Sequence, residues 1–170
     1  MLSRLFPKQF DNTYQGYQVA IWLLVPIVLL KFAMGLNVAG LNPWVSNSTV
    51  AETADGIPLA SFGLEAASTV MFLFASWGLI LFTLGLLGIV VLIRYRAMIP
   101  FLYLLISIEQ FGRFWIAKTN PIVKAAKTAV ATDAIPVGVM INWGFMAVLA
   151  IGFALSVGKT GHANSRGSAS

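Results

Sequence analysis

The chain has 170 residues, of which 58% are hydrophobic and only 10% are charged, and its net charge is +5. Soluble globular domains carry about 25% charged residues, so this composition excludes an ordinary soluble domain. The sequence has no cysteine, which excludes thiolate catalysis, disulfides and Cys-ligated metal centres. The basic residues lie mainly at the ends of apolar runs, a pattern typical of membrane orientation rather than of nucleic-acid binding.

Residues 1–15 form a short segment that we expect to lie on the cytoplasmic side, at the membrane interface. Four apolar runs follow it, and at ~1.5 Å per residue each is long enough to cross a hydrocarbon core about 30 Å thick. Inside lipid every backbone polar group needs an internal partner, so each run is predicted to be a helix. The predicted helices cover about 16–36, 69–93, 97–117 and 136–157. The first is too long for the apolar region of a signal peptide, so we expect it to stay in the membrane.

The connections decide how these helices are joined. The longest, 37–68, is polar and contains no Lys or Arg. Arg94-Tyr95-Arg96 is the whole link between the second and third helices, and so short a link predicts an antiparallel hairpin. The Gly- and Ser-rich stretch 158–170 is predicted to be a flexible polar tail. The pattern therefore predicts one all-α domain over 16–157, an integral membrane four-helix bundle with antiparallel up-down topology.

Orientation follows from the Lys and Arg residues beside the helices. With the N-terminus inside, six of them lie on the cytoplasmic side and three on the opposite side. The six are Arg4, Lys8, Arg94, Arg96, Lys159 and Arg166, and the three are Lys118, Lys124 and Lys127. We therefore expect both termini to be cytoplasmic, in a bacterial inner membrane.

Charged residues within the apolar runs are the candidate functional residues. They are Lys31 in the first run and Glu109 with Arg113 in the third, accompanied by Asn142 in the fourth and Ser76 in the second. A charge in a helix centre costs at least ~2.5–3.5 kcal/mol on insertion scales, so such groups face the bundle interior and pair. Along the helix axes Lys31, Arg113 and Asn142 all lie ~21–23 Å from the cytoplasmic ends. This common depth predicts one polar layer.

Three interpretations of this layer are open. Glu109 and Arg113 are spaced i, i+4 and share a helix face, and Lys31 would approach Glu109 from the neighbouring helix. The preferred interpretation is an interhelical clamp, for which replacing Glu109 and Arg113 together by apolar residues should be tolerated. The others are a pocket for a ligand or lipid headgroup and a proton or ion relay through Glu109.

Small residues mark the expected helix contacts. Gly78, Gly85 and Gly88 lie in the second run and Gly144 in the fourth. Spacings of three or four between small residues produce smooth faces on which helices approach closely. We expect these faces to pack within the bundle, although a homo-oligomer interface uses the same chemistry.

The tight basic turn and the start of the third helix, LIRYRAMIP at 92–100, carry a family resemblance. With the small four-helix outline, this stretch resembles bacterial DoxX-like membrane proteins and related uncharacterised families. The resemblance implies a four-helix membrane fold and adds little about function.

The sequence contains no HExxH motif, paired-carboxylate metal motif, Gly-rich phosphate loop or nucleophile with its base. We therefore predict no catalytic residue, no metal and no cofactor. The preferred function is a non-enzymatic accessory or stabilising subunit of a membrane protein complex. The alternative is a binder or transporter of a small molecule, lipid or ion through the polar layer, and a membrane enzyme comes third. The expected partners are the lipid bilayer and other membrane subunits or further copies of the chain, without nucleic acid.

Overall fold

The computed structural model describes residues 5–7, 9, 11–120 and 137–158, and in the last helix it describes side chains from Asn142 onward. Most of the predicted polar tail lies outside these residues. So do six of the nine basic residues counted for orientation, which are Arg4, Lys8, Lys124, Lys127, Lys159 and Arg166.

The described residues are helical, and no strand occurs among them. Within 11–120 and 137–158, five α-helices and two short 3-10 turns follow one another. The helices are α2 (Gln18–Val38), α3 (Asn47–Thr53), α4 (Leu64–Arg94), α5 (Ile99–Thr119) and α6 (Val137–Val157), and the turns are η1 (Leu59–Ser61) and η2 (Arg96–Met98).

The first connection differs most from its expected form. It contains α3 and η1, and α4 begins at Leu64 rather than near residue 69. Gly63 before the helix is extended, and Glu65 in the first turn complements the positive end of the helix dipole. The hydroxyls of Ser68 and Thr69 donate to the Glu65 carbonyl at 2.8 and 2.9 Å. These polar residues thus extend the helix in front of its apolar run, so hydropathy alone does not predict where α4 begins.

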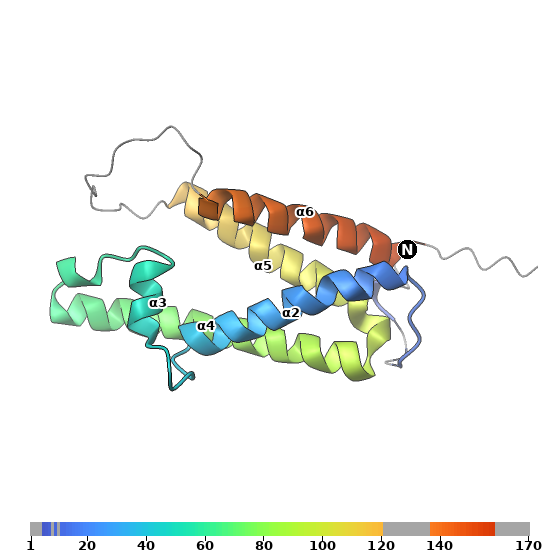
Figure 1. The fold of residues 1–170 in the computed structure, drawn as a ribbon, viewed down its shortest axis with the longest axis horizontal. Coiled ribbons are helices and arrows are strands. Elements are labelled where there is room, and N and C mark those ends of the chain that lie inside the picture. The colour runs from blue at the N-terminus through green and yellow to red at the C-terminus, as the bar shows by residue number, and fades with distance from the viewer. Residues whose placement is uncertain (1–4, 8, 10, 121–136, 159–170) are drawn as a thin grey trace, which may run out of the picture.

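The four long helices form two pairs (Figure 1). Helix α4 packs along α2, α5 pairs with α6, and α6 also contacts α2. Successive long helices run in opposite directions, and α4 and α5 separate from one another as they leave the turn that joins them (Figure 1). The start of α2, the turn between α4 and α5 and the end of α6 therefore lie at one end of the molecule.

Two apolar cores hold these helices. The larger joins α2, α4, α5 and α6, and within it the buried Tyr103 hydroxyl donates to the carbonyl of Ala20 at 2.7 Å. Its fully enclosed side chains include Leu24, Val91, Leu102, Ile106 and Leu149. The smaller core joins α2, α3 and α4 through Val38, Ala51 and Phe74. Since α5 and α6 do not contribute to the smaller core, they are held mainly along the part of α2 nearer the turn.

Glycines bring α2 and α4 into backbone contact. A Cβ added at Gly85 would lie 2.6 Å from the Cα and N atoms of Phe32, and one at Gly88 would lie 2.7 Å from the Val28 side chain. A Cβ at Gly78 would overlap the backbone of Val38 and Ala39 in the same way. Gly35 of α2, which the sequence analysis did not single out, lies against the backbone of Phe82. These contacts explain why α2 and α4 share the longest interface in the fold.

The expected packing role of Gly144 is wrong for the described residues. It is exposed, and a Cβ added there would meet nothing within 4 Å. The rotation of α6 about its axis explains the difference, because Met146 and Leu149 face the core and leave Gly144 on the outside.

By length and composition, α2 and α4 are able to cross a membrane. Only 33% of the apolar window of α2 and 28% of that of α4 is buried, so most residues of these windows are at least partly exposed. Helix α5 carries Glu109, Gln110 and Arg113, which lower its mean hydropathy, and the described apolar part of α6 is the shorter stretch Asn142–Val157.

Candidate functional site

A buried polar cluster joins three helices: Lys31 from α2, Glu109, Gln110 and Arg113 from α5, and Asn142 from α6. Lys31 reaches it because it occupies the buried face of its helix. Ile27, Val28 and Gly35 lie three or four residues away and are also buried. The lysine is only 2% exposed.

The Lys31 ammonium group has two acceptors. Its Nζ donates to Oε2 of Glu109, forming a salt bridge, and to Oε1 of Gln110 at 3.1 Å. It also lies 5.6 Å from the ring centroid of Phe145, on the electron-rich face. A buried cation is tolerated only when it is paired, and these contacts tie α2 to α5.

Gln110 connects the whole cluster, although the sequence analysis did not identify it. Its Oε1 accepts hydrogen bonds from Lys31 and, at 3.0 Å, from Nη2 of Arg113, while its Nε2 donates to Oδ1 of Asn142. It is 2% exposed. The available signal was its spacing: Gln110 follows Tyr103 and Ile106 at helical intervals on the buried face of α5. Charge within an apolar run does not identify Gln110, because its amide is neutral.

Glu109 stands between two cations. Its Oε2 accepts from Lys31, whereas its Oε1 is buried, has no hydrogen-bond donor among the described residues, and lies 3.7 Å from Nε of Arg113. The side chain of Glu109 is 18% exposed and that of Arg113 is 35% exposed. The Arg113 guanidinium also lies over the ring of Trp77 in α4, 5.4 Å from its centroid. The carboxylate is therefore more tightly bound to Lys31 than to its i, i+4 neighbour.

The structure brings together four of the five polar residues singled out from the sequence. Asn142 accepts from Gln110, and its Nδ2 donates weakly to Sδ of Met146 at 4.0 Å. Ser76 stands apart: its hydroxyl donates to the Phe72 carbonyl in its own helix at 2.8 Å, and none of the described hydrogen bonds joins it to the cluster. Its predicted membership of the polar layer is wrong because α4 turns Trp77 toward Arg113.

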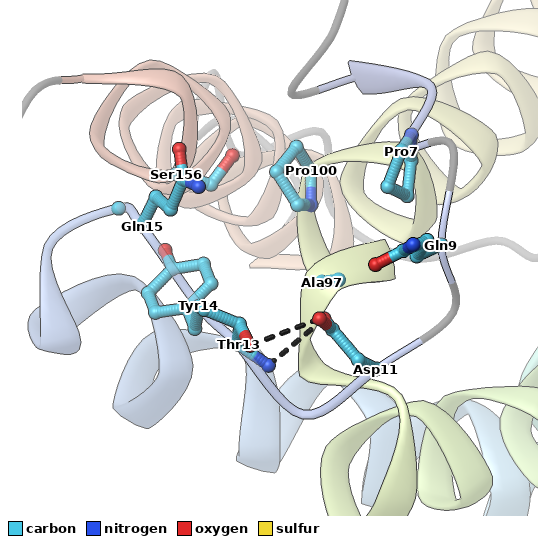
Figure 2. A pocket seen from close by; sticks show the side chains of 10 residues that line it. Pro7, Gln9, Asp11, Thr13, Tyr14, Gln15, Ala97, Pro100 and Ser156 are labelled. Carbon is cyan, nitrogen blue, oxygen red and sulfur yellow. Dashed lines mark hydrogen bonds between the residues drawn. The ribbon is translucent and has the colours of Figure 1, made fainter.

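A second polar region lies at the end of the molecule where α2 begins (Figure 2). There the N-terminal segment crosses the turn between α4 and α5, and a hollow of about 420 Å³ remains. The Ala97 amide donates to the Asp11 carbonyl at 3.3 Å. The Asp11 carboxylate accepts from the backbone amide and hydroxyl of Thr13, both at 3.0 Å. The Asp11 carboxylate thus stabilises the local conformation of the N-terminal segment.

Tyr14 forms one wall of this hollow (Figure 2). Burial raises the pKa of the Tyr14 hydroxyl to about 12, because the phenolate is poorly solvated there. The hydroxyl therefore stays protonated at physiological pH and donates to the Tyr17 carbonyl at 3.2 Å. The Tyr17 amide in turn donates to the Leu155 carbonyl at 3.2 Å and joins α2 to α6. These contacts join the N-terminal segment, α2 and α6 at this end of the molecule.

No family model matches the chain, and neither the curated proteins nor the solved structures compared with it include a match. The likeness to DoxX-like membrane proteins stays a prediction.

Proposed function

We propose that the chain is a non-enzymatic accessory or stabilising subunit of a membrane protein complex, with four membrane-crossing helices in an antiparallel up-down bundle. The outward apolar faces of α2 and α4 support the membrane location. Phe72 and Ile80 of α4 are 71% and 63% exposed, and Trp22 of α2 is 74% exposed. Apolar surface of this extent is stable against lipid or another apolar helix and unfavourable in water.

The observation that carries the subunit role is how the buried polar cluster is enclosed. Lys31 and Gln110, at its centre, are each 2% exposed and bind partners from other helices. Two hollows elsewhere in the fold are lined by other residues: one by the N-terminal segment, and the other by Leu87, Val90 and their neighbours near the turn. A cluster whose centre is enclosed and joins three helices acts as a clamp on helix register, which suits a scaffold better than a binding pocket.

On this proposal α5 and α6 also cross the membrane, although α5 carries three charged residues. Glu109 and Lys31 neutralise one another, so that insertion as a packed bundle costs less than insertion of α5 alone. We propose both termini on the cytoplasmic side of a bacterial inner membrane, because Arg94 and Arg96 at the α4–α5 turn lie at the same end as the start of α2.

Extraction of native membranes with alkaline carbonate tests the membrane proposal. A chain with four membrane-crossing helices should remain in the pellet, and only detergent should release it. A chain that lies on the surface through its N-terminal segment would instead appear in the carbonate supernatant, which would contradict the proposal.

Native mass spectrometry after purification in a mild detergent tests the subunit role. We expect a defined mass that contains the chain together with at least one other membrane protein. A single copy, or several copies of this chain alone, carrying a reproducible small molecule or lipid would contradict the accessory role. That result would favour the alternative, a binder that uses the polar cluster.

A further inference from the structure

The buried polar cluster carries more positive than negative charge. It contains two cations, Lys31 and Arg113, and one anion, Glu109, while Gln110 and Asn142 are neutral. Two positive charges and one negative charge leave a net charge of +1. Within apolar helices such a surplus is costly, and it is usually answered by an anion.

The surplus charge lies on Arg113. Lys31 is enclosed and is bonded directly to the carboxylate. Arg113 is 35% exposed, its Nε is 3.7 Å from Glu109, and its one described hydrogen bond goes to the neutral amide of Gln110. A guanidinium group has five N–H donors, so Arg113 has the capacity to bind a further anion from outside the bundle.

The depth of Arg113 bears on the source of that anion. Its Cα lies six residues before the end of α5 at Thr119, which corresponds to ~9 Å along the axis. The guanidinium points further from that end, because it contacts Glu109 and Gln110 one turn earlier in the helix. A lipid phosphate lies outside the hydrocarbon and does not reach this level without thinning the bilayer. A carboxylate carried by another transmembrane helix is placed there directly.

The surface around Arg113 suits a helix. Ile116 lies three residues after Arg113 and four after Gly112, so it adjoins both of them on one face of α5. A Cβ added at Gly112 would meet nothing within 4 Å, and Ile116 is 61% exposed. A glycine beside a cation allows close backbone approach and leaves the guanidinium accessible. Gly112 and Ile116 are both exposed, while the Arg113 guanidinium itself lies over the ring of Trp77 in α4.

We propose that Arg113 forms an ion pair with an Asp or Glu side chain in a transmembrane helix of a partner subunit, which packs on α5 at Gly112, Arg113 and Ile116. Guanidinium and carboxylate form two parallel charge-assisted hydrogen bonds, which fix the depth and rotation of the partner helix. This inference rests on the proposed function as a subunit of a membrane complex, and it identifies the chemistry of the partner.

Photocrosslinking of the full chain in its native membrane tests the ion pair. A photoreactive amino acid replaces Ile116, beside the proposed contact, or Ile151 on α6, which is similarly exposed at 56%. We expect the Ile116 probe to crosslink to an apolar segment of another membrane protein, at a position within about two helical turns of an Asp or Glu. The Ile151 probe should leave that segment unlabelled. A carboxylate so placed faces Arg113.

Charge variants then test whether Arg113 recognises that carboxylate. Both Arg113→Gln and Arg113→Glu should lower the crosslink yield at Ile116 at least tenfold. Combining Arg113→Glu with replacement of the partner's carboxylate by Arg exchanges the two charges, and this combination should restore the yield. Lys118→Gln, which removes a charge from the exposed end of the same helix, should leave the yield unchanged. Size-exclusion profiles check that each variant is folded.

Three outcomes would overturn the ion pair. Crosslinks to phospholipid alone would assign Arg113 to a lipid headgroup, and crosslinks to a second copy of this chain would make α5 a homo-oligomer interface. An unchanged yield with Arg113→Gln would show that the charge of Arg113 plays no part in the contact. If native mass spectrometry still finds another subunit, these outcomes overturn only the ion pair. If native mass spectrometry finds no other subunit, the proposed function as an accessory subunit is itself contradicted.

Discussion

Replacement of Glu109 by Leu should destabilise the chain by about 3–5 kcal/mol, the usual cost of removing one partner from a buried ion pair. The variant leaves Lys31, which is 2% exposed, without its anion. The free energy of unfolding in mixed micelles of a mild detergent and dodecyl sulfate measures the loss. Replacement of Lys31 by Met should cost less, because Arg113 then remains 3.7 Å from the carboxylate.

The double variant Lys31→Met with Glu109→Leu is the control for this prediction. We expect it to recover most of the loss, because both buried charges disappear together and Arg113 keeps its contact with Gln110. If the two single losses simply add in the double variant, the clamp between α2 and α5 is not an interacting pair.

The same geometry reverses the expectation drawn from the i, i+4 spacing. Replacement of Glu109 and Arg113 together should not be tolerated, because it leaves Lys31 buried with only the amide oxygen of Gln110 as acceptor. The charges that can be removed as a pair are those of Lys31 and Glu109.

Replacement of Gly85 by Ala should destabilise the contact between α2 and α4 by about 1–3 kcal/mol, the usual cost of overpacking. The new methyl group would lie 2.6 Å from two backbone atoms of Phe32, and backbone cannot rotate away as a side chain can. The temperature of unfolding of the purified protein, followed by circular dichroism, measures the effect.

Gly144→Ala is the matched control, since it makes the same chemical change in another long helix. A Cβ there meets nothing within 4 Å, and Ala favours helix more than Gly does, so the unfolding temperature should stay equal or rise. An equal loss at both positions would mean that the glycines act through the helix backbone rather than through the α2–α4 contact.

The positions of the long helices follow closely from the sequence. Helix α2 begins at Gln18 where residue 16 was expected, and α5 begins at Ile99 where residue 97 was expected. Runs of apolar residues identify such helices without knowledge of their neighbours. The presence of α3 did not follow, because its polar and small residues depend on packing around Ala51. The early start of α4 did not follow either, because its first turn is largely exposed and carries a charge, and the Ser68 and Thr69 hydroxyls bond to the Glu65 carbonyl there.

The polar cluster is more instructive, because the sequence predicted part of it. Agreement in depth along separate helices was enough to associate Lys31 with Arg113 and Asn142, since depth depends only on residue number, and the i, i+4 spacing to Arg113 added Glu109. Rotation about each helix axis is independent of depth, and the sequence does not specify it for Ser76 or Gly144. The Ser76 hydroxyl bonds within its own helix, and Gly144 faces open space.

By itself, then, the sequence determined that the chain is helical, where its long helices run and at what depth their charged residues lie. The tertiary structure decided which residues meet: Lys31 rather than Arg113 takes the carboxylate of Glu109, and Gln110 joins them to Asn142. The physical reason is that hydropathy and spacing are properties of one helix, whereas the partner of a buried charge depends on the angle at which two helices pack. That angle leaves Arg113 as the exposed cation of the cluster.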